Sequence, residues 1–136
     1  MKKALLIIIT GGLMMAAGFA ISTLANTVSP ALEVEYHNPH LFRPWSDPLM
    51  QLYWLVPFIN SLILFRVWAL GKSLIRGDLY VRRGLSFAFS YWMVTLPGMI
   101  MSYSSFPVSF GMVITWTVSG LAQAIVAGIL FARFNP

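Results

Sequence analysis

The chain has 136 residues, a net charge of +5 and no cysteine. Its length suits one domain, and the absence of cysteine excludes disulfides, thiol catalysis, iron–sulfur clusters and thiolate zinc sites. Hydrophobic residues make up 58% of the chain and charged residues 10%, against about 25% charged in a soluble domain. A water-soluble fold of this size cannot hide that much apolar surface, so the composition predicts an integral membrane protein.

The first predicted span covers residues 4–25, directly after the basic pair Lys2 and Lys3. A helix of this length is about 33 Å long, enough to cross the hydrocarbon core. The alternative is a cleaved signal peptide, because the small residue Ala25 precedes Asn26 as it would at a cleavage site. The apolar run exceeds the roughly 7–15 residues usual in a signal peptide, which favours retention as a membrane helix.

Residues 26–47 form the long polar segment of the chain, and we expect them to be a loop outside the membrane. Pro30, Pro39 and Pro44 interrupt this segment, and proline is excluded from helix interiors. The sequence therefore predicts an irregular loop with one extended piece around residues 32–36.

An extended backbone would place alternating side chains on one face, and here these are Glu33, Glu35 and His37, with His40 three residues later. Carboxylates and imidazoles are ligands for zinc or copper, so these four residues are the candidate metal ligands. The spacing matches no metalloprotease signature, and a solvated loop is the alternative. Because histidine can change its charge within the physiological pH range, the two histidines would also make the loop sensitive to pH.

The string from Phe42 to Pro48 is the most distinctive in the chain. Trp45 is a predicted interface anchor, and Arg43 is expected to stack on Trp45, bond a helix-end carbonyl or pair with Glu33, Glu35 or Asp47. Asp47 and Pro48 are typical of a helix start. We interpret the string as the hinge between the loop and the second span, with a patch for docking a partner as the alternative.

The second span is expected at residues 48–71, and Pro57 should kink it and free the carbonyl of Tyr53. Arg66 falls near the far interface, where its side chain can extend to the headgroups. Residues 72–83 form a basic connection to an uncharged run from Gly84 to Ala132. This run is too long for one crossing.

Turn-forming residues near the middle of that run divide it into a third span at 84–103 and a fourth at 109–132. Pro97 and Gly98 should kink the third span. The fold class predicted is an all-α membrane protein, an up-down-up-down bundle of four transmembrane helices in a single domain over residues 1–136.

With four spans, one side of the membrane holds eight of the nine basic residues, and the other holds Arg43 with three acids. The eight are Lys2, Lys3, Arg66, Lys72, Arg76, Arg82, Arg83 and Arg133. The positive-inside rule therefore predicts a multi-pass protein of the cell membrane with both termini cytoplasmic. The basic residues are expected to meet anionic lipid headgroups, and no solvated basic face with interleaved aromatics indicates a nucleic acid partner.

Small residues repeat every four positions on the first and fourth spans, a spacing that allows close helix packing in lipid. They are Gly12, Ala16 and Ala20 on the first span and Gly120, Ala124, Gly128 and Ala132 on the fourth. We expect these two spans to pack against each other; a homo-oligomer interface is the alternative.

Asn60 and Gln123 lie at similar depth near the middles of their spans. An amide in hydrocarbon should find a hydrogen-bond partner, so a mutual or backbone bond is expected, with a pathway for substrate or water as the alternative. No carboxylate, histidine or lysine lies at mid-membrane depth, which argues against a proton-coupled multidrug transporter.

Kinks at Pro57 and Pro97 would splay the second and third spans and open an outward cleft for an amphiphile or lipid. The residues expected to line this cleft are Tyr53, Trp54, Thr95, Ser102 and Tyr103. The alternative is that the kinks only shape the bundle.

No catalytic motif is present in the sequence, and no cofactor is expected. The sequence favours a non-enzymatic accessory or assembly subunit that acts through helix packing and its outside loop. The alternatives are a small transporter or amphiphile-binding protein that uses the cleft, and a protein that binds metal through the loop.

Overall fold

The computed structural model describes residues 2–136, and every regular element in them is helical. The elements are α1 (Lys3–Val28), α2 (Pro30–Tyr36), the 3₁₀ helix η1 (Pro48–Leu55), α3 (Val56–Gly71), α4 (Tyr80–Ser105) and α5 (Phe110–Phe134). Four stretches, of which η1 and α3 together make one, are long and apolar enough to cross a membrane. The expected all-helical chain with four apolar helices is therefore confirmed.

α2 replaces the extended piece expected around residues 32–36, so that prediction was wrong. Pro30 occupies the first turn of α2, where a proline costs no hydrogen bond because the first N–H groups have no partner in the helix. The distance to Pro39 leaves room for two helical turns. The prolines thus delimit a short helix instead of preventing one.

η1 replaces the kinked α-helix expected in the second span. Asp47 caps it, as predicted, by accepting a hydrogen bond of 2.9 Å from the Leu49 N–H. Pro57 lies in the first turn of α3, and the Val56 N–H donates to the Tyr53 carbonyl, which is therefore not free. An i→i+3 pattern before the proline avoids the clash with the carbonyl four residues back that an α-helix would create.

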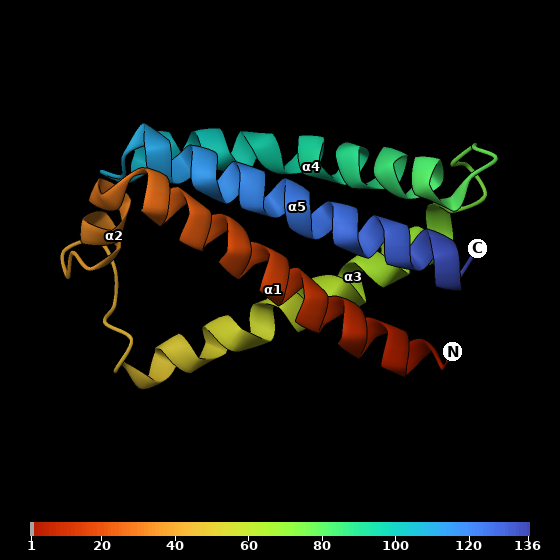
Figure 1. The fold of residues 1–136 in the computed structure, drawn as a ribbon, viewed down its shortest axis with the longest axis horizontal. Helices are drawn as coiled ribbons and strands as arrows, with labels where there is room; N and C mark the ends of the chain where they lie inside the picture. The colour runs from red at the N-terminus through yellow and green to blue at the C-terminus, as the bar shows by residue number, and fades with distance from the viewer. Residues whose placement is uncertain (1) are drawn as a thin grey trace.

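Figure 1 shows α5 lying between α4 on one side and α1 on the other, with α3 crossing α1. Both chain ends and the connection between α3 and α4 lie at one end of the molecule, which we call the basic end (residues 2–3, 72–83 and 133–136). α2, η1 and the connection between α4 and α5 lie at the other end, which we call the loop end (residues 29–55 and 106–109). Toward the loop end, η1 and α3 diverge from α4 (Figure 1).

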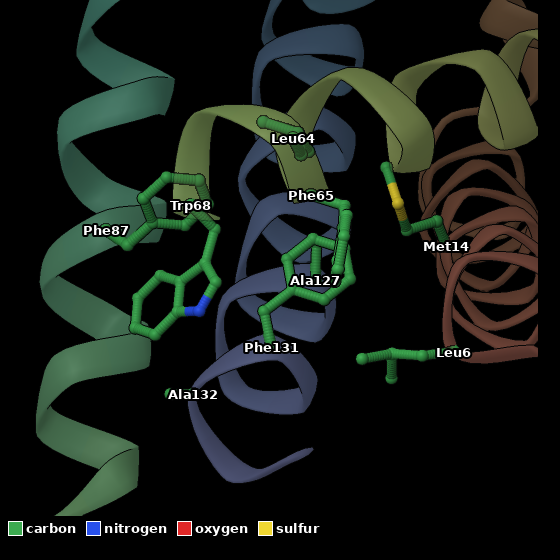
Figure 2. Close-up of a cluster of buried hydrophobic side chains, with 9 residues drawn as sticks. All are labelled: Leu6, Met14, Leu64, Phe65, Trp68, Phe87, Ala127, Phe131 and Ala132. Carbon is green, nitrogen blue, oxygen red and sulfur yellow. The ribbon is translucent and has the colours of Figure 1, made fainter. Parts of the chain in front are cut away.

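All four long helices contribute to the main core (Figure 2). Most of its residues belong to the helix halves nearer the basic end. The fully buried Trp68 of α3 packs edge-on against Phe87 of α4, with ring centroids 5.3 Å apart. Phe65 packs in the same way on Phe131 of α5 at 5.4 Å. Because lipid is as apolar as these side chains, close packing between helices is what such a core contributes in a membrane.

Glycines allow the close helix contacts. A Cβ on Gly84 would lie 2.7 Å from the Gly128 carbonyl of α5, and one on Gly11 would lie 2.6 Å from the Phe58 ring of α3. On α5, Ala124, Gly128 and Ala132 of the predicted repeat are buried, whereas a Cβ on Gly120 would meet nothing within 4 Å.

The repeat on α1 does not pack as expected. A Cβ on Gly12 would meet nothing within 4 Å, and Ala16 and Ala20 are exposed. α1 does contact α5, but the residues that it buries are Leu6, Thr10, Gly11 and Met14. The larger apolar side chains fill the core, which turns the small ones outward.

Candidate functional site

α2 is fixed to the start of α5 by two long-range hydrogen bonds at the loop end. The Ser109 N–H donates to Glu35 Oε1 at 2.6 Å, and Trp116 Nε1 donates to the Tyr36 hydroxyl at 2.7 Å. The Glu35 carboxylate thus lies at the amino end of α5, where the helix dipole favours negative charge. Leu32 of α2 is buried against Met112 and Val113, so α2 forms a cap over the bundle.

The string from Phe42 to Pro48 connects this cap to η1, which agrees with its interpretation as a hinge. The Phe42 ring contacts Trp116, with centroids 6.3 Å apart. Arg43 pairs with Asp47 at 2.8 Å, which is one of the partners expected for it, and does not stack on Trp45. The pKa of Asp47 is lowered, first by the Leu49 N–H and then by the Arg43 guanidinium.

The four candidate metal ligands do not converge. Glu35 is engaged by Ser109, His37 Nδ1 lies 2.8 Å from the Glu33 carbonyl, and the His40 N–H donates to Asn38. Within residues 2–136, no group of three or more His, Asp or Glu side chains is placed to hold a metal ion. The helical backbone of α2 separates Glu33 from Glu35, whereas an extended backbone would have aligned them.

Of the residues expected to line a cleft between the second and third spans, Tyr53 and Trp54 contact each other, with ring centroids 6.4 Å apart, but the α4 members lie elsewhere. On η1, Trp54 packs against Trp45 and against Phe19 of α1, with ring centroids 6.3 and 5.5 Å apart, and Tyr53 packs edge-on against Trp45 at 5.5 Å. These aromatic residues form an exposed cluster at the loop end.

The α4 members of the set face elsewhere. The Thr95 and Ser102 hydroxyls donate to carbonyls of their own helix, and the Tyr103 ring contacts Phe110 of α5, with centroids 5.8 Å apart. The five residues therefore do not form one lining, because α4 packs along α5 and not beside η1; the outward cleft itself stays a prediction. An apolar groove of about 310 Å³ lies instead between α4 and α5, and its lining includes Leu96, Ile100, Tyr103, Phe110 and Ile114.

The predicted pair of intramembrane amides is also separated. Gln123 donates to the Ser119 hydroxyl at 3.2 Å and lies against Gly18 of α1, where an added Cβ would be 2.8 Å from Gln123 Nε2. Asn60 forms no hydrogen bond with it. Buried links that sequence reasoning missed include the Ser61 hydroxyl, which donates to the Ile7 carbonyl at 2.8 Å. The position of Ser61 among large apolar residues of the second span was the feature of the sequence that could have indicated this hydrogen bond.

The basic end holds a second cluster. Trp68 Nε1 donates to the Asn135 carbonyl at 2.8 Å, and the guanidinium of Arg83 lies over the Trp68 ring, 5.5 Å from its centroid. Arg83 Nη2 also donates to the Lys72 carbonyl at 3.0 Å. On the neighbouring helix, Arg133 lies over the Tyr80 ring at 5.5 Å. These contacts hold cationic and aromatic side chains together where the uncharged run of α4 begins.

No family model, curated protein or solved structure matches this chain. The geometry of the two ends and of the helix faces is therefore the basis on which a function is assigned.

Proposed function

We propose that the chain crosses the cell membrane four times, up-down-up-down, with both termini and the basic end in the cytoplasm. The lengths of the four apolar helices support this. So does the placement of the basic residues, because the loop end carries Arg43 with three acids and the other eight basic residues lie elsewhere, as the positive-inside rule requires. Reporter fusions after Pro136 and within residues 38–40 test it: both reporters on one side would refute four crossings.

Within that topology, the role that the geometry supports best is that of a non-enzymatic accessory or assembly subunit. The observation that carries this proposal is the outward face of α1. Gly12 has open space around it, and Ala16 and Ala20 are exposed, while α1 uses a different face to contact α3 and α5. Small residues at this spacing allow another helix to approach closely, so this face suits a helix of a partner protein or of a second copy.

The capped loop end supports the same role. Glu35 and Tyr36 hold α2 on α5 through hydrogen bonds to Ser109 and Trp116. A fixed surface loses less entropy on association than a flexible loop would. The loop end therefore offers a partner a preformed surface outside the membrane.

Affinity purification in a mild detergent, followed by identification of the retained protein, tests the subunit role. Gly12→Leu should abolish retention of the partner or of a tagged second copy. Gly98→Leu is the matched control, because Gly98 also has open space around it but lies on α4. Equal retention by both variants, or no specific partner and no second copy for the parent chain, would refute the role.

An amphiphile-binding protein is the second candidate, and the groove between α4 and α5 is the observation that favours it. Its lining is almost entirely apolar, which suits an acyl chain. If an acyl chain is the ligand, a single-chain amphiphile should raise the melting temperature of the parent chain. Ile114→Trp should remove that shift by filling the groove, while Ile63→Trp, at an exposed position on α3, should keep it.

A further inference from the structure

Arg83 is held by the structure but is not neutralised by it. Its guanidinium is fixed by the Lys72 carbonyl and the Trp68 ring, and its Nε–H is buried with no acceptor. The Arg43–Asp47 pair is the one salt bridge among residues 2–136, so Arg83 forms no salt bridge with a carboxylate of the described residues. A guanidinium carries five N–H donors in a planar fork that suits phosphate oxygens.

The amino end of α4, which favours negative charge because of the helix dipole, has no acidic or capping side chain. Its cap residue is Leu79, which offers no side-chain oxygen, and its first turn holds no acid. The first turn instead holds Arg82, with Arg83 directly after it, the reverse of what the helix dipole favours. Free N–H groups at a helix start together with arginines form a site suited to an anion.

The connection before α4 is shaped around these arginines. Gly77 has φ +156°, and a Cβ there would lie 3.1 Å from Arg83 Cγ. The backbone thus lies directly against the arginine stem, which only glycine allows at this conformation. Lys72 and Arg76 belong to the same connection, and Asp78 is the one acid in it.

Exposed leucines lie in and next to the same connection. Leu70, Leu74 and Leu79 are 84%, 82% and 67% exposed, which would be unfavourable in water. At the boundary of a bilayer they would contact acyl chains while the arginines reach the headgroups. A soluble anion would leave these leucines uncovered, so the surroundings favour a lipid as the source of the phosphate.

We propose that the connection between α3 and α4, with Arg83 at its centre, binds the phosphate of an anionic phospholipid in the cytoplasmic leaflet. The site rests on the membrane insertion proposed above and not on the subunit role. Phosphate oxygens bind Arg83 and Arg82 at the start of α4, and the acyl chains pack on the exposed leucines. Arg76 adds long-range attraction, whereas the Lys72 ammonium donates to the Pro136 carbonyl.

Native mass spectrometry of the full chain, titrated with phosphatidylglycerol and with phosphatidylcholine, tests this proposal. The parent chain should prefer phosphatidylglycerol, and Arg83→Gln should lower that affinity by about fivefold or more. Arg43→Gln removes the same charge at the loop end and should leave the affinity unchanged. No preference in the parent chain, or equal losses in the two variants, would overturn the site.

Thermal unfolding of the parent chain in detergent gives a measurement that needs no variant. Phosphatidylglycerol should raise the melting temperature, and inorganic phosphate at the same concentration should not. Equal stabilisation by inorganic phosphate, or by phosphatidylcholine, would refute an anionic lipid as the ligand. A chain that lacks lipid preference but retains its partner refutes only this site, whereas the reverse result refutes only the subunit role.

Discussion

Gly84→Ala should destabilise the contact between α4 and α5, although alanine is the better helix former. A Cβ at this position would lie 2.7 Å from the Gly128 carbonyl group, about 0.7 Å short of the 3.4 Å at which ordinary contact begins. The obstructing atoms are backbone, so the side chain cannot turn away and the two helices must separate. Overpacking of this kind costs about 1–3 kcal/mol.

Gly98→Ala is the matched control, because Gly98 lies on the same helix and a Cβ there would meet nothing within 4 Å. Alanine is favoured over glycine in a helix by about 1 kcal/mol, so this variant should be as stable as the parent chain or more stable. Both variants gain the same helix propensity, so the difference between them reports the packing cost alone. We expect Gly84→Ala to be less stable than Gly98→Ala by about 1–3 kcal/mol.

The assay is reversible unfolding in mixed detergent micelles, followed by circular dichroism, with the parent chain and both variants measured in parallel. A Gly84→Ala variant as stable as Gly98→Ala would refute the reasoning, because it would mean that α4 and α5 do not approach at this glycine. Loss of stability in both variants would point to a general need for glycine in α4 and would refute it equally.

Further predictions concern the cap over the loop end and the start of η1. Tyr36→Phe should destabilise the chain by about 0.5–1.5 kcal/mol and shift Trp116 fluorescence, since it removes the bond from Trp116 Nε1; unchanged emission would contradict the docking of α2. Burial raises the pKa of Tyr36 above 10.0. The contribution of the neutral Tyr36 side chain to the free energy of unfolding should therefore be complete below pH 10 and lost as the pH rises through the folded pKa. Tyrosinate absorbance of the parent chain and Tyr36→Phe would show this. The pKa of Asp47 is lowered from 3.8 by the Leu49 N–H and Arg43. The contribution of the Asp47 carboxylate to stability should therefore be present above about pH 4 and lost as the pH falls through the lower folded pKa. Asp47→Asn should remove that acid transition from Trp45 and Trp54 fluorescence, and an unchanged transition would contradict the cap.

The sequence was sufficient for the number and positions of the long helices. Uncharged runs such as residues 84–132 report directly on membrane-length helices, because hydropathy is a property of consecutive residues. Asp47 was also recognised as a cap from local chemistry alone. α2 was missed because its stability depends on contacts with distant residues, such as that between Glu35 and Ser109.

The candidate site was harder to predict, because the sequence does not say how a helix is rotated or which neighbour it has. The repeat of Gly12, Ala16 and Ala20 was expected to pack on the fourth span but lies on the exposed side of α1. The expected lining residues were chosen from the prolines of the second and third spans, and the sequence did not reveal that α4 packs closely along α5, as at Gly84 and Gly128.

The coiling of η1 also bears on bilayer thickness. A 3₁₀ helix rises about 2.0 Å per residue and an α-helix about 1.5 Å, so the eight residues of η1 would lose about 4 Å if they rewound into α form. Hydrophobic mismatch costs only fractions of a kcal/mol per Å. If the chain crosses a membrane as proposed above, rewinding η1 would shorten the second span to match a thinner bilayer.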